Sequence, residues 1–254
     1  MHIPPPNADV LGVRVHALSW ASAIELIAAW ASRREARYVC LCNVHSVVTA
    51  GRDTTLLDAI NGADLATPDG MPVAWLLRRA GHCGQERIDG PDLMWNLCAT
   101  AEERGLSVFL YGSTADTLAR LTANLLQQFP RLRLAGMHAP PFRPLTEQET
   151  AQMVERIRSA QPHLVFVGLG CPKQELWMSA NRSQLQAVLL GVGAAFDFHA
   201  ARMRRAPPWM RRAGLEWCFR LLSEPRRLWK RYLITNSLFM VRVARRLLFG
   251  STNA

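Results

Sequence analysis

Residues 106–114, Leu-Ser-Val-Phe-Leu-Tyr-Gly-Ser-Thr, carry the clearest structural signal in this 254-residue chain. The first six residues form an apolar run that is rich enough for a strand buried on both faces, which is typical of a parallel sheet. Gly112, Ser113 and Thr114 then open a helix that is predicted to reach Phe129. A buried strand followed directly by a helix predicts one βα unit of a layered α/β domain.

The same alternation of strands and helices continues on both sides of this unit. Strands are predicted at residues 11–17, 38–42, 64–67, 132–137, 163–167 and 187–192. Helices are predicted at residues 19–33, 53–60, 71–79, 91–104 and 146–160. Repeated βα units predict a Rossmann-like, mainly parallel sheet with helices on both faces. The Pro-rich segment 139–144 is interpreted as a surface loop, because the alternation resumes after it.

The C-terminal part of the chain has a different composition from the rest. Residues 202–254 hold 13 of the 30 Lys and Arg residues but only 2 of the 20 Asp and Glu residues, which gives them a net charge of +11 and leaves −1 for residues 1–201. Helices are predicted at 208–223 and 226–248, with no strand between them. The pattern predicts a body of residues 1–200 and a basic helical appendage of residues 201–254, whose partner is anionic.

Two kinds of anionic partner fit an appendage that is rich in Trp and Arg. A nucleic acid would have its phosphates bound by Arg and its bases stacked on Trp. An anionic membrane surface would suit amphipathic helices with Arg on one side and Trp, Phe and Leu on the other. The appendage has more apolar residues than a phosphate-binding surface requires, which favours the membrane. Some of these residues would instead pack on the body.

The cysteines and the N-terminus indicate the compartment. Six Cys residues are scattered at 40, 42, 83, 98, 171 and 218, with no Cys-x-x-Cys pair and no His partners at zinc spacing. This arrangement predicts a reducing cytoplasm and no structural metal, with Cys40 and Cys42 as small core residues. The segment 1–6 lacks the basic and apolar regions of a signal peptide. No segment reaches the roughly 20 apolar residues that span a bilayer.

Three strand-to-helix loops carry polar residues at the sheet edge where doubly wound folds bind ligands. One contains Asp69, another is the glycine-rich segment 168–175, and the third is the segment 111–114. Taken alone, each has a simpler interpretation. Asp69 suits a turn or helix cap, 168–175 matches neither the Gly-x-Gly-x-x-Gly nor the Walker pattern, and 111–114 suits an ordinary helix start.

These loops and the appendage together resemble the WecG/TagA/CpsF glycosyltransferases. The shared motifs, in order, are Ala63–Gly70, Arg87–Leu93, Phe166–Glu175, Arg205–Pro207 and Leu215–Arg220. The resemblance covers about residues 10 to 235. It implies a bacterial, inverting enzyme with a Rossmann-like body and a membrane-binding appendage. Such an enzyme is bound peripherally at the cytoplasmic face of the cell membrane. It moves a sugar from a UDP-sugar to a polyprenyl-diphosphate-linked sugar in surface polysaccharide synthesis.

The resemblance also implies roles for individual residues. Asp69 corresponds to the general base of the Pro-Asp-Gly motif, and Asn43, Arg87 and Gln174 correspond to pocket residues. Further candidates for substrate binding in these loops are Thr67, Gly112, Gly170, Lys173 and Glu175. The arginines expected to reach the lipid diphosphate are Arg205, Arg220, Arg227 and Arg231.

The sequence departs from the family pattern at two places that bear on specificity. Leu41 stands where the family tends to have Thr, two residues before the pocket Asn, which alters how a substrate would be oriented there. The segment 136–142 also differs from the loop that the family usually carries. The residues do not identify the donor sugar.

No Asp-x-Asp spacing, the usual metal-holding motif of glycosyltransferases, occurs in the chain. Arginines and helix N-termini would then have to stabilise the departing diphosphate. We therefore expect a metal-independent enzyme that needs no cofactor besides its UDP-sugar donor and does not bind nucleic acid. A basic nucleic-acid-binding α/β protein is the alternative. A nucleotide-cofactor oxidoreductase is less favoured, because no dinucleotide fingerprint follows the first strand.

Overall fold

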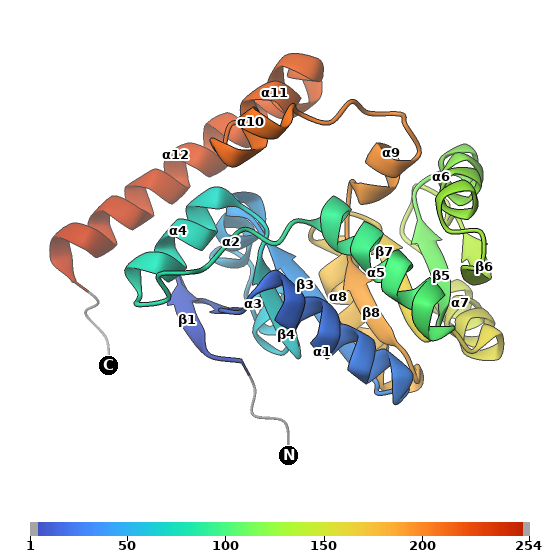
Figure 1. Cartoon of the computed structure of the whole chain (residues 1–254). Helices are drawn as coiled ribbons and strands as arrows, with labels where there is room; N and C mark the ends of the chain where they lie inside the picture. The colour runs from blue at the N-terminus through green and yellow to red at the C-terminus, as the bar shows by residue number, and fades with distance from the viewer. Residues whose placement is uncertain (1–4, 251–254) are drawn as a thin grey trace.

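A computed structural model describes residues 5–250 and shows a six-stranded sheet between two layers of helices (Figure 1). All strand pairs of this sheet are parallel, and the strand order is β4-β3-β8-β7-β5-β6. The strands are β3 (Arg37–Cys42), β4 (Leu65–Pro68), β5 (Ser107–Gly112), β6 (Arg133–His138), β7 (Leu164–Gly168) and β8 (Val188–Gly191). Parallel pairing places the carboxyl ends of all six strands at one edge of the sheet.

Alternating side chains of each strand bury the two faces of the sheet separately. Val39 and Leu41 of β3 belong to one core cluster, whereas Tyr38, Cys40 and Cys42 belong to the other. The first cluster is covered by α1 (Trp20–Ser32), α5 (Gly90–Arg104) and α6 (Ala115–Gln128). The second is covered by α2 (Val44–Ala50), α3 (Thr54–Asn61), α4 (Met71–Arg79), α7 (Glu147–Ala160) and α8 (Lys173–Asn181). The predicted parallel sheet with helices on both faces is confirmed, as is the placement of Cys40 and Cys42 in the core.

The N-terminal segment forms a hairpin where a single strand was predicted. Two antiparallel strands, β1 (Asn7–Val10) and β2 (Val13–His16), are joined by Leu11 and Gly12, whose φ angles are +55° and +94°. Positive φ at both turn residues is the geometry of a tight two-residue hairpin turn. The prediction of a strand over residues 11–17 was therefore wrong at its start. Residues 1–4, on which much of the signal-peptide prediction rests, lie outside the described residues.

Two helical details also differ from prediction. The helix expected over 208–223 is divided at Gly214, whose φ is +74°, into α10 (Pro208–Arg212) and α11 (Glu216–Ser223). A short helix, α9 (Ala195–His199), follows β8 and leads into the appendage. The segment 139–144 is a loop between β6 and α7, as predicted.

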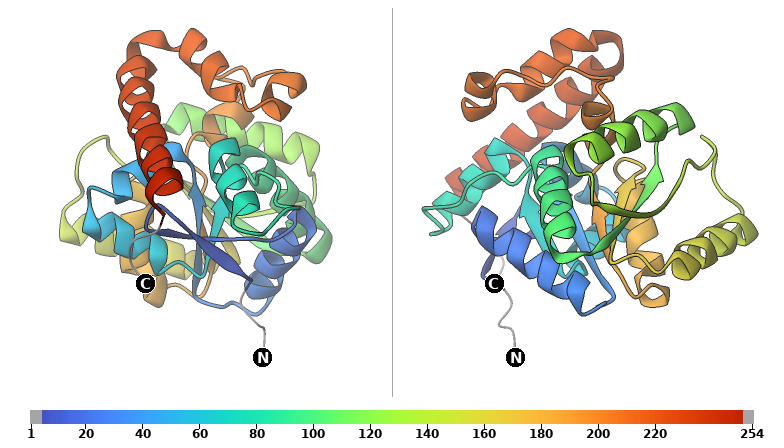
Figure 2. Two further views of the ribbon diagram at one scale, coloured as in Figure 1. Left: turned by 90° about the vertical axis from the view of Figure 1, so that its left-hand side faces the viewer. Right: turned by 45° about the vertical axis from the view of Figure 1, so that its right-hand side comes forward.

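The appendage ends in α12 (Pro225–Phe249), which extends along the body beside α2 (Figure 2). Phe239 and Val243 are buried in the second core cluster. Arg242 Nη2 donates a hydrogen bond to the carbonyl of Gly51 at 3.2 Å, and Arg246 pairs with Asp9 of the hairpin. One side of α12 is thus part of the folded core. None of the helices within residues 5–250 combines the length and apolarity needed to cross a membrane.

Candidate functional site

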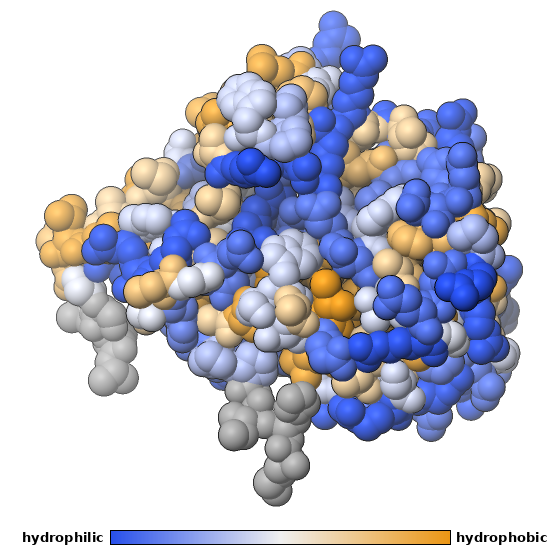
Figure 3. Space-filling view, viewed as in Figure 1, coloured by the Kyte–Doolittle hydropathy of each residue, from blue (hydrophilic) through white to orange (hydrophobic). Residues whose placement is uncertain are grey.

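A cleft of about 1030 Å³ opens at the carboxyl edge of the sheet, between the body and the appendage. The loops that follow β3, β4, β7 and β8 form its floor, and residues of α11 and α12 form its roof. Figure 3 shows mainly hydrophilic surface in the recess between the appendage and the body. The cleft lies where doubly wound sheets bind their ligands and has the size of a small-molecule site.

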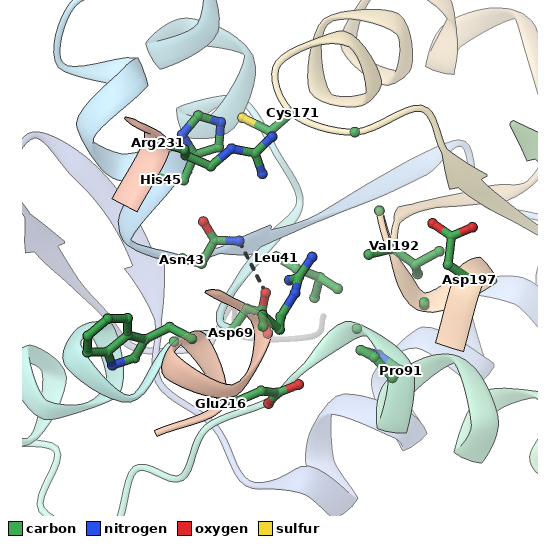
Figure 4. A pocket seen from close by; sticks show the side chains of 18 of the residues that line it. Leu41, Asn43, His45, Asp69, Pro91, Cys171, Val192, Asp197, Glu216 and Arg231 are labelled. Carbon is green, nitrogen blue, oxygen red and sulfur yellow. Dashed lines mark hydrogen bonds between the residues drawn. The ribbon is translucent and has the colours of Figure 1, made fainter. Parts of the chain in front are cut away.

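Asp69 lies on the floor of the cleft, directly after β4. Its backbone N–H donates to the carbonyl of Cys42 at 2.9 Å, and its Oδ2 accepts a hydrogen bond from Asn43 Nδ2 at 3.3 Å (Figure 4). The N-cap of α4 is Gly70, which offers no side-chain cap, so the Asp69 carboxylate does not cap that helix. Burial raises the pKa of Asp69, while Arg87 and Asn43 act in the opposite direction.

Asn43 is held in place by the start of α2. Its Oδ1 accepts from Ser46 N–H at 3.1 Å, and Ser46 Oγ accepts from the backbone N–H of Asn43 at 2.9 Å, which completes a capping box. The amide oxygen is therefore occupied by the cap, and the amide nitrogen is directed to Asp69. Helix α2 is only seven residues long and had not been predicted from the sequence.

Arg87 extends from the loop before α5 to Asp69. Its Nε donates to the backbone carbonyl of Asp69 at 2.5 Å. Its Nη2 lies 2.6 Å from Glu216 Oε2, 3.6 Å from Asp89 Oδ2 and 3.8 Å from Asp69 Oδ1. The Arg87 side chain is only 15% exposed. A single guanidinium thus stands among three carboxylates, one of which comes from the appendage.

Gln174 joins two of the loops that form the floor. Its Oε1 accepts from the N–H of Gly170, after β7, and from the N–H of Gly193, after β8, both at 3.1 Å. Its Nε2 donates to Glu175 Oε1 at 2.9 Å. Both side chains are buried, and the second oxygen of Glu175 has no hydrogen-bond partner among the described residues. Burial raises the pKa of Glu175.

The roof of the cleft supplies most of its positive charge. Arg220 of α11 and Arg227 and Arg231 of α12 line the cleft, together with Arg202. Of the lining residues that the structure describes, Arg87 is the one Arg or Lys contributed by residues 5–200. Burial and the nearby Arg231 lower the pKa of His45 to about 4, so this ring is neutral at physiological pH (Figure 4). The appendage therefore contributes the cations that an anionic ligand in the cleft would meet.

Two of the predicted cations lie elsewhere. Arg205 Nη2 donates to Asp89 Oδ1 at 2.7 Å and to Asp92 Oδ2 at 2.9 Å, at the N-terminus of α5. These ion pairs fasten the start of the appendage to the body and place Arg205 outside the cleft wall. Lys173 is the exposed first residue of α8 and is not part of the cleft wall either.

Two other predicted residues, Thr67 and Gly112, lie in strands of the sheet and not in the cleft wall. Thr67 is fully buried in β4, and its hydroxyl has no hydrogen-bond partner in the described chain. A Cβ atom at Gly112 would stand 2.5 Å from the carbonyl oxygen of Gly168, so glycine is required where β5 and β7 approach each other. Thr114 accepts from Thr117 N–H at 3.1 Å and is an ordinary N-cap of α6. Gly170, in contrast, lines the cleft.

Titratable residues of the cleft that sequence reasoning missed include Glu216, Asp197 and His45. Glu216 belongs to the motif 215–220, but nothing in the sequence indicated that it would pair with Arg87. Asp197 lies across the cleft from Asp69 in Figure 4, and burial raises its pKa. Within residues 5–250, no group of three or more His, Cys, Asp or Glu side chains is arranged to hold a metal ion.

Comparison with known proteins connects the cleft to a family. A family model described as "Glycosyl transferase WecG/TagA/CpsF family" matches residues 8–253. The chain is 31% identical over 192 residues to an N-acetylglucosaminyldiphosphoundecaprenol N-acetyl-beta-D-mannosaminyltransferase of Bacillus subtilis (strain 168), covering 75% of this chain and 73% of that protein. It is 33% identical over 175 residues to a protein of the same name from Bacillus spizizenii, covering 68% of this chain and 66% of the relative.

Proposed function

Because this chain belongs to the WecG/TagA/CpsF family of glycosyltransferases, we propose that its cleft transfers a sugar from a UDP-sugar to a polyprenyl-diphosphate-linked sugar. The observation that carries the proposal is the meeting of Asp69 with Arg87 and the appendage arginines in one cleft at the carboxyl edge of the sheet. A carboxylate beside a set of cations provides both a proton acceptor and a binding site for phosphates.

The proposed reaction is a single displacement. The acceptor hydroxyl oxygen attacks the anomeric carbon of the donor sugar while its proton passes to the Asp69 carboxylate. The bond between the anomeric carbon and the β-phosphate oxygen breaks, and its electron pair leaves with UDP. One displacement inverts the configuration at the anomeric carbon. Burial favours this role for Asp69, because a base whose pKa lies above its ordinary value holds the transferred proton more strongly.

Arginines are proposed to take the place that a metal has in many glycosyltransferases. The two diphosphates, one on the donor and one on the acceptor, bring several negative charges into the cleft. Arg87, Arg220, Arg227 and Arg231 line it and carry planar guanidinium groups that match phosphate oxygens. The proposed reaction therefore needs no metal ion.

The outer side of the appendage is proposed to bind the membrane that holds the lipid-linked acceptor. Apolar side chains on α11 and α12 are strongly exposed outside the cleft, with Leu222 at 75%, Leu233 at 62% and Leu248 at 76%. Arg245 of α12 is exposed as well. A basic surface with exposed apolar residues suits the interface of an anionic bilayer. We propose the cytoplasmic face of a bacterial cell membrane as the site of this reaction.

The names of the two Bacillus relatives indicate which substrates to test first. We propose N-acetylmannosamine as the transferred sugar and N-acetylglucosaminyl-diphosphoprenol as the acceptor. The test is mass spectrometry of the acceptor after incubation with UDP-N-acetylmannosamine, UDP-glucose or UDP-N-acetylglucosamine. We expect the acceptor to gain one N-acetylhexosamine with the first donor. A gain with UDP-glucose instead would correct the sugar, and no gain with any donor would contradict the proposed function.

A further inference from the structure

Glu216 is a residue of the appendage that is buried against the body. It is the first residue of α11, only 8% exposed, and its Oε2 lies 2.6 Å from Arg87 Nη2. We propose that Glu216 is a positioning residue for the transfer reaction, which acts by holding Arg87 and, through Arg87, the loop that carries Asp69. This inference rests on the function proposed for the cleft, and it assigns to the appendage a role besides binding phosphates and the membrane.

Two contacts of one guanidinium connect α11 to the proposed base. At one end, Arg87 Nε donates to the backbone carbonyl of Asp69. At the other end, Arg87 Nη2 meets the Glu216 carboxylate, whose side chain is 11% exposed. Oε2 of Glu216 has no aligned hydrogen bond among the described residues, so this contact is an ion pair. A pair this shielded from water is stronger than one on the surface, and the loss of one partner leaves a buried charge.

The other carboxylates near Arg87 do not replace Glu216. Asp89 Oδ1 already accepts from Asp92 N–H at 3.0 Å, as the N-cap of α5, and from Arg205 at 2.7 Å. Its Oδ2 is 3.6 Å from Arg87, which is 1.0 Å farther than Glu216. The remaining carboxylate is that of Asp69 itself, at 3.8 Å. Without Glu216, the guanidinium would be free to approach the Asp69 carboxylate.

That approach would weaken Asp69 as a base, because a close cation stabilises the ionised carboxylate. The charged groups that face Asp69 are Arg87 and Asp89 from the loop before α5, and Glu216 and Arg220 from α11. The neutral amide of Asn43 faces it from the start of α2. Glu216 therefore favours a higher pKa of Asp69 in two ways. It keeps the Arg87 guanidinium away from the Asp69 carboxylate, and its own negative charge opposes ionisation of Asp69. Removing the charge of Glu216 should lower the pKa of Asp69.

The test is a double-mutant cycle with Glu216→Gln, Arg87→Ala and the double variant. Glutamine keeps the size of the side chain and removes its charge. We expect Glu216→Gln to lower kcat by about 10- to 100-fold with a smaller change in KM, as for a misplaced reacting group, and to move the acidic limb of the kcat/KM profile to lower pH. In the Arg87→Ala background, the same substitution should lower kcat much less, because the contact that connects Glu216 to the Asp69 loop is already lost and only the direct effect of the Glu216 charge on Asp69 remains.

A matched control is Glu155→Gln, which removes an exposed carboxylate paired with Arg158 on α7. This variant should match the wild type in kcat and in its pH profile. Either of two results would overturn the proposal: a Glu216→Gln variant with wild-type kcat and pH profile, or an equal loss of kcat with and without Arg87. A merely structural role of Glu216 would lower stability in both backgrounds without moving the pH profile.

Amide hydrogen exchange of the full chain separates this inference from the proposed function. Glu216→Gln should speed exchange in peptides that cover residues 66–72 and 85–89, and Glu155→Gln should not. This result does not depend on any sugar donor. If the wild type transfers no sugar from any UDP-sugar, the proposed function fails, while the exchange data still decide whether Glu216 holds the Asp69 loop. Unchanged exchange in both peptides would show that Glu216 does not hold the loop that carries Asp69.

Discussion

Asn43 and Asp69 are joined by a hydrogen bond of 3.3 Å from the amide nitrogen of Asn43 to the carboxylate of Asp69. The two residues follow neighbouring parallel strands whose last pair is Cys42 with Pro68. Because Asn43 also caps α2 with its amide oxygen, the direction of its nitrogen is fixed. The proposed base is therefore oriented by the sheet edge and one helix start, before any substrate binds.

The two functions of Asn43 can be separated by substitution. Asn43→Ser keeps an oxygen that can cap α2 but removes the amide donor, so we expect near wild-type thermal stability with reduced kcat. Asn43→Ala removes both and should also lower the free energy of unfolding by about 1 kcal/mol, the usual cost of a lost N-cap. Thermal melts and UDP-release assays measure the two effects. Wild-type turnover by Asn43→Ser would show that Asp69 does not need the amide.

The pH dependence of the reaction should reflect the raised pKa of Asp69. A general base acts in its ionised form, so kcat/KM should fall as pH is lowered through the pKa of the folded protein. Burial raises that pKa, and the fall should therefore begin at a higher pH than for an exposed aspartate. Initial rates of UDP release across the acidic range test this. A rate that stays constant down to the ordinary pKa of aspartate would argue against a buried carboxylate base.

Arginines of the appendage should differ in effect according to where they lie. Arg227→Glu and Arg231→Glu place negative charge in the cleft wall and should reduce turnover of a water-soluble diphosphate-linked acceptor by about 10-fold or more. Arg245→Glu, on the exposed side of the same helix, should leave that turnover unchanged and reduce flotation with anionic liposomes. Equal turnover of all three variants would limit the appendage to membrane binding.

Removal of metal ions should not stop the reaction. Five arginines line the cleft where the diphosphates are proposed to bind, so we expect full activity after dialysis against EDTA. The measurement is UDP release before and after chelation, with and without added Mg²⁺. Activity that is lost on chelation and restored by Mg²⁺ would overturn the metal-independent mechanism.

The layered fold was predictable because its signals are local. Apolar runs such as 106–111 and capping residues such as Asp53 identify βα units without knowledge of their neighbours. The N-terminal hairpin was missed because its turn, Leu11-Gly12, lies within an apolar stretch that resembles one strand. Helix α2 was missed because seven residues are too few to show a helical period.

The site was predictable only as far as the loops at the carboxyl edge. Strand ends pointed to the loops that carry Asp69 and Gln174, the family resemblance pointed to Asn43, and all three residues line the cleft. Pairings between the body and the appendage are not visible in the sequence, because they depend on how α11 docks. Arg205 was therefore expected at the diphosphate but pairs with Asp89 and Asp92, and Glu216 received no role although it meets Arg87.

Acceptor-dependent UDP release by the wild type and by Asp69→Asn is the most direct test of the proposed mechanism. Asparagine keeps the shape of the side chain and should leave thermal stability unchanged or raised, because burial disfavours the charge of Asp69. We predict that the wild type releases UDP only when the polyprenyl-diphosphate-linked acceptor is present. Asp69→Asn should do so at least about 100-fold more slowly. Near wild-type release by Asp69→Asn, in a variant that remains folded, would contradict the assignment of Asp69 as the base.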